Sequence, residues 1–397
     1  MVFLLKKLSI IGFFVCIGII LIAYGKGYRL SINENKITEN GILGITSNPE
    51  SAKITINKII KGATNTNLTL RSGTYDIVLS KEGYQNWSKT INVKKDVVSR
   101  ADAWLFPNNP SLFPLTSNGV RKVYTSDDSQ KLIFLGTNDT DVPELGLYLY
   151  QNSPNKFVFG NGKKLIINIS QLPYFDENSS KIIFSPIDES IIISYGNKPL
   201  LFRAYLVPTD GTVTLTDVSK SASTLISTWE KIRVERKVKF LTKLDSKLSK
   251  ASLTYFKEFK VSPDANKIYY QAKVSGALPK IIEPELVGTN QTPQTRDLVA
   301  GNYYVYDIKE DKNFAINSES ELFWYTSSIH LLGIEKGKSN NPVITIRDFD
   351  DSNHLTIYSS PFDGNFVSIS PDGKLIILAN LNPQINPLPE LYQVGIR

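Results

Sequence analysis

The sequence contains two histidines, the side chains best suited to proton transfer at neutral pH, and neither lies in a known catalytic motif. His330 falls in an apolar stretch expected to be a strand, and His354 follows a polar run expected to be a turn. A serine nucleophile needs a base beside it, and the sequence has no G-x-S-x-G motif. We therefore expect His330 to be buried in packing, and we assign no catalytic residues.

Oxygen-bearing side chains cluster just before His354, where they could bind calcium. The candidate ligands are Asp348, Asp350, Asp351 and Asn353. An EF-hand loop would need glycine at its sixth place and glutamate at its twelfth, where this chain has Asn353 and Ser359. A solvated loop is expected here and at the acidic run 138–141. The chain also lacks the glycine patterns that bind phosphates or dinucleotides. No metal, cofactor or enzymatic activity is predicted.

The first element that we expect is a transmembrane helix at 8–24, a stretch without charge. With the apolar residues just before Lys6 it approaches the thickness of a bilayer core, about 30 Å. Basic residues flank it almost equally, so the positive-inside rule gives nearly a tie. A short basic start before an apolar run is typical of an export signal, which places 1–7 in the cytoplasm and most of the chain outside.

Two alternatives concern this segment. The small-x-small pattern Ala23-Tyr24-Gly25 could be a cleavage site, although the apolar run is long for a cleaved signal. The bulk of the chain could instead face the cytoplasm as a membrane scaffold. Cys16 lies in the middle of the run, without small residues before it, so lipidation is not expected. It is the only cysteine, and no intrachain disulfide can form.

After a linker at 25–40, hydrophobic residues alternate with others along several short segments up to residue 106. This period of two, broken by turn signals such as Lys61-Gly62 and Glu82-Gly83, predicts a small antiparallel β-sandwich. The segment 41–106 resembles a PEGA domain. The residues that carry the resemblance are Ser47, Pro49, Ala52, Gly62, Thr64, Leu70, Gly73, Tyr75, Gly83 and Tyr84. The resemblance implies an extracytoplasmic structural or adhesion module.

The remainder, 107–397, contains a weak repeat in which a polar turn precedes an apolar strand. The marker positions are Asp127, Asp176, Asp264, Ser327 and Asp372. These copies are similar to the Ser-Pro-Asp-Gly repeats of the periplasmic Tol-system propeller and of Trp-Asp-repeat-like blades. We expect a β-propeller of five blades, with six as the alternative. The last strand, near Leu391–Ile396, is expected to close the ring against Leu112–Leu115.

Two insertions interrupt the repeat. Apolar residues at helical spacing predict a helical insertion at 224–250, and the composition of 275–297 predicts a loop. Basic residues crowd the helical insertion: Lys231, Arg233, Arg236, Lys237, Lys239, Lys243, Lys247 and Lys250, against Glu230, Glu235 and Asp245. We expect a docked helix with a solvated face, with a membrane or partner surface as the alternative.

The fold class expected is therefore all-β, with one N-terminal transmembrane helix. The net charge of +7 suits weak attraction to anionic surfaces, and no motif that reads nucleic acid occurs. The hypothesis is a membrane-anchored cell-envelope protein whose propeller binds an unknown protein or cell-wall polymer. The alternative is an extracytoplasmic hydrolase that uses paired carboxylates at the propeller mouth. The order of anchor, sandwich and propeller resembles that of PEGA-containing surface proteins of bacteria.

Overall fold

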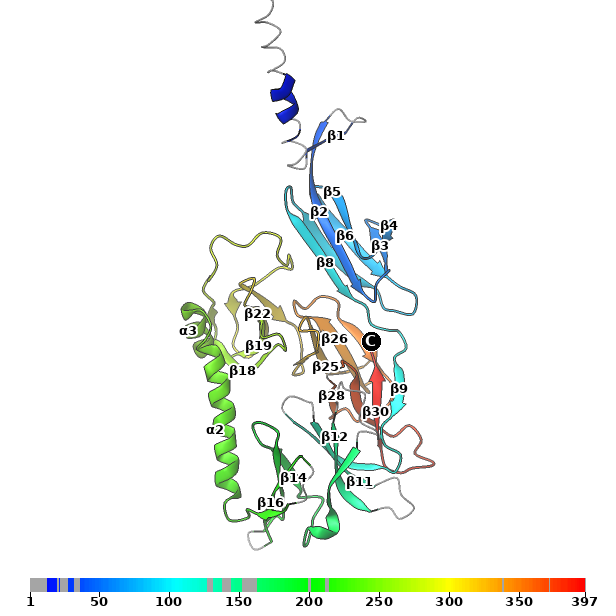
Figure 1. Cartoon of the computed structure of the whole chain (residues 1–397), viewed down its shortest axis with the longest axis vertical. Helices are drawn as coiled ribbons and strands as arrows, with labels where there is room; N and C mark the ends of the chain where they lie inside the picture. Colours follow the sequence, from blue (N-terminus) through cyan, green and yellow to red (C-terminus); the bar gives the residue numbers. More distant parts are fainter. Residues whose placement is uncertain are drawn as a thin grey trace, which may run out of the picture. The chain divides into compact units, whose positions relative to one another are not determined.

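The computed structural model of the chain describes residues 13–19, 21, 28–31, 36–126, 131–137, 144–151, 163–198, 201–210, 214–337, 339–370 and 372–396. Residues 13–19 and 21 are helical, and the rest of the segment 8–24 lies outside the described residues, as does 1–7. Among the described residues no helix has the length and apolar character needed to cross a bilayer. The expected all-β class is confirmed, because strands make up most of the regular secondary structure in the described residues (Figure 1).

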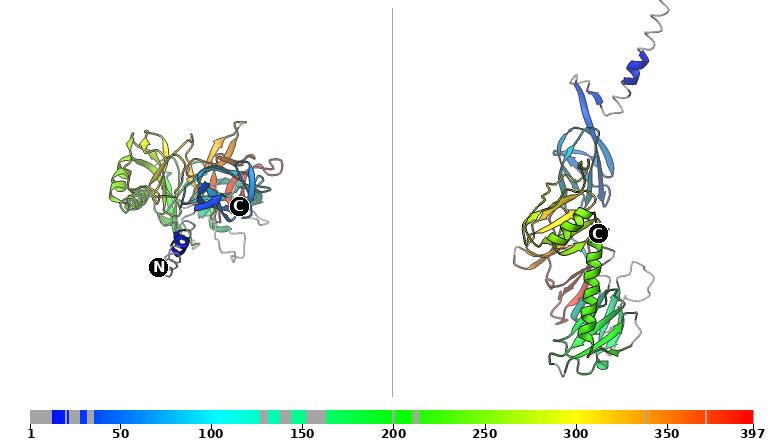
Figure 2. Two further views of the ribbon diagram at one scale, coloured as in Figure 1. Left: turned by 90° about the horizontal axis from the view of Figure 1, so that it is seen from above. Right: turned by 90° about the vertical axis from the view of Figure 1, so that its left-hand side faces the viewer.

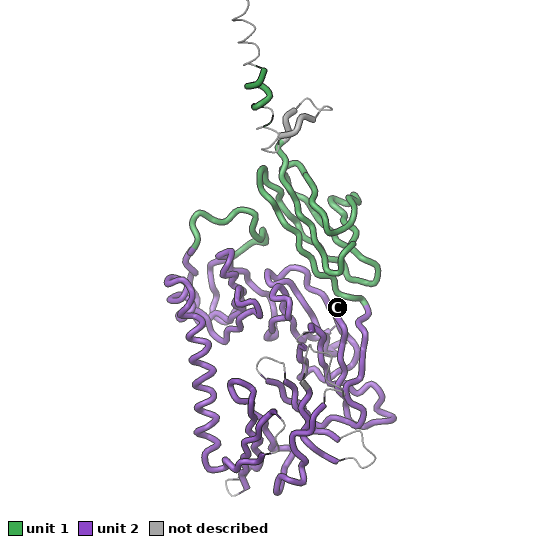
Figure 3. The backbone as a smooth tube through the Cα atoms, viewed as in Figure 1, with its two compact units in different colours: residues 1–108, 282–294 green, residues 109–281, 295–397 purple. Residues whose placement is uncertain are grey.

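The chain divides into two compact units (Figure 3). Residues 1–108 and 282–294 form the first, here called the sandwich unit. Residues 109–281 and 295–397 form the second, here called the five-sheet unit. The segment 282–294 therefore belongs to the sandwich unit although the sequence inserts it within the other.

Two sheets make the sandwich unit. In one sheet β2 (Lys36–Asn48) pairs antiparallel with β1 (Tyr28–Ser31) and β5 (Thr66–Arg71), and parallel with β8 (Val98–Trp104). The other has the order β4-β3-β6-β7, with β4 Ile59–Ala63, β3 Lys53–Ile56, β6 Gly73–Ser80 and β7 Trp87–Val93. Because β1 and the start of β2 fall within 25–40, part of the expected linker is β-structured.

The core of the sandwich unit follows from the alternation in its strands. Side chains at every second position of β2, β3, β6 and β7 point inward, and they include Leu43, Ile54, Leu79 and Val93, all fully buried. Gly83 has φ +81° in the turn before β7, a conformation that glycine adopts without strain. The side-chain amide of Gln291, from 282–294, pairs with both backbone groups of Asn92 on the edge strand β7.

Five four-stranded antiparallel sheets follow one another through the described residues of the five-sheet unit. The first is β10 (Val120–Thr125), β11 (Lys131–Thr137), β12 (Leu145–Gln151) and β13 (Lys163–Asn168). The second is β14 (Lys181–Phe184), β15 (Ser190–Tyr195), β16 (Arg203–Pro208) and β17 (Thr216–Asp217). The third is β18 (Phe256–Val261), β19 (Lys267–Ala272), β22 (Tyr303–Asp307) and β23 (Lys312–Ile316). The fourth is β24 (Phe323–Trp324), β25 (His330–Lys336), β26 (Pro342–Asp348) and β27 (Leu355–Tyr358).

The fifth sheet joins the two ends of this unit. It contains β28 (Val367–Ile369), β29 (Leu375–Ala379) and β30 (Glu390–Gly395), with β9 (Ser111–Pro114) as its fourth strand. Val394 pairs with Leu112, and Tyr392 pairs with Pro114. The pairing that we expected between the last strand and the segment near Leu112 is thereby confirmed.

Buried apolar side chains pack three of the junctions between neighbouring sheets. Apolar clusters join the fifth sheet to the first, the first to the second, and the third to the fourth. Between the second and third sheets lie two helices, α2 (Ala222–Leu241) and α3 (Ser246–Tyr255), which replace the single helical insertion expected at 224–250 (Figures 1 and 2). The break falls at Asp245, whose side chain accepts a hydrogen bond from the N–H of Lys247 and caps α3.

The ends of α2 are buried and its middle is not. Near its start, Trp229 packs on Ile192 and Ala204 of the second sheet. Its last residue, Leu241, packs with Leu248 and Ala251 of α3 against the third sheet. Every residue from 234 to 239 is exposed, so the helix bridges two sheet faces with a solvated middle.

The other insertion, expected as a loop at 275–297, is mostly irregular. Its two ends pair as β20 (Gly276–Ala277) and β21 (Asp297–Leu298). A buried ion pair fixes this base, because the guanidinium of Arg296 lies 3.0 Å from the carboxylate of Asp311, which also accepts a hydrogen bond from the Tyr306 hydroxyl. Burial, followed by this bond to Asp311, raises the pKa of Tyr306.

Candidate functional site

The turns between first and second strands of the sheets share a hydrogen-bond arrangement. The arrangement is seen among the described residues of four turns. In each, a buried serine donates its N–H to a backbone carbonyl at the start of the second strand. The serine hydroxyl accepts that same residue's N–H, so it extends the ladder by one step. These serines are Ser126, Ser185, Ser262 and Ser370, paired with Lys131, Ser190, Lys267 and Lys374.

Three of the five repeat markers lie in these turns. Asp264 and Asp372 each accept a hydrogen bond from the serine hydroxyl that begins their turn. Ser327 lies in the equivalent turn of the fourth sheet, where Tyr325 replaces the first serine. Asp127 lies outside the described residues.

The marker Asp176 was wrongly aligned with the other copies. It lies in the loop that precedes the first strand of its sheet, where it accepts hydrogen bonds from Ser179 and Asn178. The equivalent turn runs from Ser185 to Ser190 and contains Asp188. Both segments place a polar turn before an isoleucine-rich strand, which is why the pattern alone chose the wrong one.

His330 is the centre of a serine–histidine–aspartate chain. Its Nδ1 lies 2.7 Å from the hydroxyl of Ser327, and its Nε2 lies 3.3 Å from Oδ1 of Asp348. The imidazole is only 2% exposed, as expected from the apolar sequence around it. This chain of contacts links the turn to the second and third strands of the sheet.

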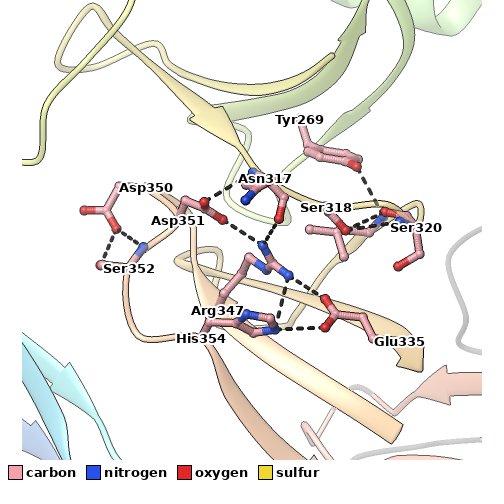
Figure 4. Close-up of polar contacts among 11 residues, drawn as sticks. Tyr269, Asn317, Ser318, Ser320, Glu335, Arg347, Asp350, Asp351, Ser352 and His354 are labelled. Atoms are coloured by element: carbon pink, nitrogen blue, oxygen red, sulfur yellow. Dashed lines mark hydrogen bonds and ion pairs between the residues drawn. The ribbon is translucent and has the colours of Figure 1, made fainter. Parts of the chain in front are cut away.

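The largest polar cluster of the fourth sheet surrounds Arg347, which is 3% exposed (Figure 4). Its guanidinium donates to the carbonyl of Asn317 at 2.7 Å, to Asp351 at 2.8 Å and to Glu335 at 2.5 Å. Nε2 of His354 lies 3.2 Å from the same guanidinium and 3.1 Å from Glu335. One buried cation therefore holds two carboxylates and a backbone carbonyl in place.

This cluster joins elements from two neighbouring sheets. Asn317 follows the last strand of the third sheet, whereas Arg347 and Glu335 lie on β26 and β25 of the fourth. Nearby, the hydroxyl of Tyr269 from the third sheet accepts the N–H of Leu322 (Figure 4). Burial raises the pKa of Tyr269, so its hydroxyl stays protonated. The cluster has the geometry of a seam between sheets.

The candidate calcium ligands do not converge on one point. Asp351 binds Arg347, whereas Asp350 accepts hydrogen bonds from Ser352. The Asn353 amide and the Ser352 hydroxyl both donate to Asp348. Within the described part of the chain no group of three or more His, Cys, Asp or Glu residues is arranged to hold a metal ion. The acidic run 138–141 lies outside the described residues.

Sequence reasoning also missed the buried carboxylate of Glu390. It is 8% exposed and lies at the first residue of β30, where the two ends of the unit meet. Its carboxylate accepts hydrogen bonds from the Thr116 hydroxyl at 2.5 Å, the Gly119 N–H at 2.6 Å and the Asn386 amide at 2.5 Å. The one sequence signal for this site was the position of Glu390 at the start of the last expected strand.

Exposed lysines mark the surface of α2, α3 and the segment that connects them. The ammonium-bearing residues Lys231, Lys237, Lys239, Lys243, Lys247 and Lys250 are all exposed. Two arginines on the same helix are engaged, because Arg233 donates to the carbonyl of Phe184 and Arg236 to that of Pro186. These bonds fix α2 to the second sheet and leave the lysines on the outside.

Comparison with solved structures finds similarities of low identity. The chain is similar to TolB from Acinetobacter baumannii at 12% identity, covering 81% of this chain and 60% of that chain, with a TM-score of 0.24. It is similar to an oligogalacturonate lyase in complex with manganese at 12% identity, covering 86% and 81%, with a TM-score of 0.22. The β-propeller domain of the Trilobed protease from Pyrococcus furiosus matches at 9% identity over 71% and 72%, with a TM-score of 0.20. Scores of this size carry no argument about function.

No curated protein that was compared with the chain matches it. A family match does exist for the first folded part, and it covers residues 40–108. That range agrees with the segment 41–106 in which the sequence resembled this family, and it spans strands from β2 to β8. Residues 40–108 of this chain are a PEGA domain.

Proposed function

We propose that this chain is a membrane-anchored, extracytoplasmic binding or structural protein of the cell envelope. In this proposal the five-sheet unit presents a surface to a protein or polymer. The PEGA domain at 40–108 is the observation that carries the proposal, because the family resemblance implies an extracytoplasmic module. The five-sheet unit follows that domain directly along the chain.

Exposed apolar side chains support the anchor. Phe13, Phe14 and Ile19 on the described helical residues are 63%, 66% and 62% exposed. Such side chains are stabilised by transfer out of water, at about 25 cal/mol per Å² of apolar surface. The uncharged sequence at 8–24 provides a segment in which this transfer occurs without burying a charge.

The polar clusters support binding rather than catalysis. Glu335 and Asp351 are two carboxylates in one cluster, and both are bound to Arg347. A carboxylate that is already bound to a guanidinium is not positioned to contact a substrate, as a general acid or nucleophile must be. His330 is enclosed between Ser327 and Asp348. The residues that could do chemistry are thus committed to holding the sheets.

Fractionation and protease shaving of intact cells test this proposal. With a C-terminal epitope, the full chain should enter the membrane fraction and lose its epitope to external protease. Replacing Phe14 and Ile19 with lysine should release the protein from membranes, whereas replacing both with leucine should not. An epitope protected in intact cells but digested after lysis would support the cytoplasmic scaffold and overturn the proposal.

A further inference from the structure

The bridging helix α2 has an exposed middle section, from which Arg236 reaches the second sheet by its hydrogen bond to the Pro186 carbonyl. Trp229 and Leu241 bury its two ends, while residues 234 to 239 are exposed on every side of the helix. Figure 2 shows α2 running alongside the unit from the second sheet to the third. A helix normally derives most of its stability from packing one face along its length. The middle of α2 is exposed instead, so a ligand can approach it from several directions.

Positive charge is concentrated on this helix pair. Residues 230–250 carry eight basic and three acidic side chains, which leaves +5 of the whole chain's +7. The five exposed lysines of α2 and α3, and Lys243 between the helices, make no ion pair within 4.0 Å with a described carboxylate. Their ammonium groups are therefore available to an anionic partner.

Spacing suits a linear ligand. From Lys231 to Lys239 the axis of α2 advances about 12 Å, at about 1.5 Å per residue. Lys237 lies between them on another side of the helix, and Lys243 and Lys247 continue the series onto α3. A flexible chain with a negative charge every few ångströms can contact several of these ammonium groups at once. Such contacts between point charges do not need the fixed geometry of a bidentate arginine pair.

A membrane surface fits this helix less well. A helix that lies in a bilayer interface needs a continuous apolar face opposite its basic one. In the exposed middle of α2 the apolar residues are Val234 and Val238, which are 51% and 41% exposed. The larger apolar side chains of the helix are committed to the sheets at its two ends. The charge pattern favours a soluble or wall-linked polymer over a lipid surface.

We propose that α2 and α3 form a binding surface for a linear polyanion rich in phosphate groups. This inference rests on the proposed function to the extent that it names the ligand class of the five-sheet unit. Binding would release counterions from the polymer, so affinity should fall steeply as salt rises. Phosphate groups suit these lysines because an ammonium group binds phosphate as a compact point charge and needs no bidentate geometry.

The test measures binding of the full chain, in nanodiscs of uncharged lipid, to long-chain inorganic polyphosphate. Replacing Lys231, Lys237 and Lys239 with glutamine should weaken binding at least about tenfold, since each lysine contributes to charge neutralisation. The matched control replaces Lys198, Lys309 and Lys336, three exposed lysines of the same unit, and removes the same charge. The control should change affinity less than about twofold.

Three outcomes would overturn the inference. They are no binding of polyphosphate by the unaltered chain, equal weakening by both triple variants, and binding only to vesicles of anionic lipid. Circular dichroism of each variant shows whether its helices are retained, and glutamine is chosen because it favours helix nearly as well as lysine. If polyphosphate binding fails, the result of protease shaving still supports the proposed location. If shaving shows that the epitope faces the cytoplasm, the proposed location is overturned but polyphosphate binding is not.

Discussion

Arg347 shows how a single buried charge can fix several elements. Its guanidinium contacts the Asn317 carbonyl and the carboxylates of Glu335 and Asp351, so one side chain connects a loop, a strand and a turn. The attraction within such a group is strong because little water reaches it. Removing one charged residue lowers stability by more than the intact ion pair adds to it, because the remaining charges stay buried without a partner.

Replacing Arg347 with methionine should destabilise the five-sheet unit by about 3 kcal/mol. The two carboxylates would then lie close together without a cation. Adding Glu335→Gln and Asp351→Asn to the same chain should recover part of the loss, because the repulsion disappears. Urea denaturation followed by circular dichroism measures both differences. A single variant as stable as the unaltered chain would show that the cluster does not hold the seam.

Asp264 links stability to pH at the level of one turn. Burial acts to raise the pKa of its carboxyl, but hydrogen bonds from Asn266 and Ser262 outweigh it and hold the pKa below its usual value. A lowered folded-state pKa means that the stabilisation is present above the unfolded value, near 4. It is lost as pH falls through the lower folded value.

The Asp264→Asn variant should therefore be less stable than the unaltered chain at pH 7, by about 1 kcal/mol. The difference should shrink as pH falls below about 4, where the aspartate itself becomes protonated. Thermal unfolding at a series of pH values measures this. Asp297→Asn is the control, because Asp297 is exposed and lies outside these turns. A difference that stays constant down to pH 2 would contradict the linkage.

Among the elements, the strands were easier to predict than the helices. Buried second strands such as β29 read as continuous apolar runs, and the alternation in β6 and β7 predicted the sandwich. The pairing of β30 with β9 followed from the need to close a ring of sheets. The place of α2 between two sheets did not follow, because helical spacing shows that a helix forms and not which faces it covers.

The polar clusters were harder to predict for the same reason. Arg347 meets Glu335 across paired strands and Asn317 across a junction between sheets, and neither relation has a fixed spacing in the sequence. The acidic run at Asp348 suggested a metal site because its neighbours along the chain were all that could be seen. In three dimensions those carboxylates face different partners.

Trp229 should carry most of the attachment of α2 to the second sheet. It is 7% exposed and packs on Ile192 and Ala204. Trp229→Ala should cost about 3 kcal/mol, because the side chain leaves a cavity beside the sheet. Val238→Ala, on the exposed middle of the same helix, should cost less than about 0.5 kcal/mol. Urea denaturation of the two variants compares them, and equal losses would argue against the bridging arrangement.

At the scale of the whole five-sheet unit, Glu390 secures the closure. It receives hydrogen bonds from Thr116 and Gly119, which lie 274 and 271 residues away along the chain. Thr116 also accepts the N–H of Leu391 with its hydroxyl. The two ends of the unit are therefore joined by buried side chains in addition to the strand pairing of β9 and β30.

Glu390→Ala should destabilise this unit by about 3 kcal/mol, because it leaves the Thr116 hydroxyl and the Gly119 N–H without their acceptor. Glu390→Gln should cost less, since the amide oxygen still accepts. Limited proteolysis should show faster cleavage near residues 109–119 in the alanine variant, as β9 detaches. Unchanged proteolysis together with unchanged unfolding would show that strand pairing alone closes the unit.

The position of β9 also constrains how the protein is made. Its partner β30 lies far along the chain, so β9 has no neighbour on that side until residues 115–389 between them have been synthesised. Contacts so distant in sequence form slowly, and an unpaired strand is prone to associate with other chains. If the chain is exported, the five-sheet unit can complete its fifth sheet only after β30 has followed β9 across the membrane.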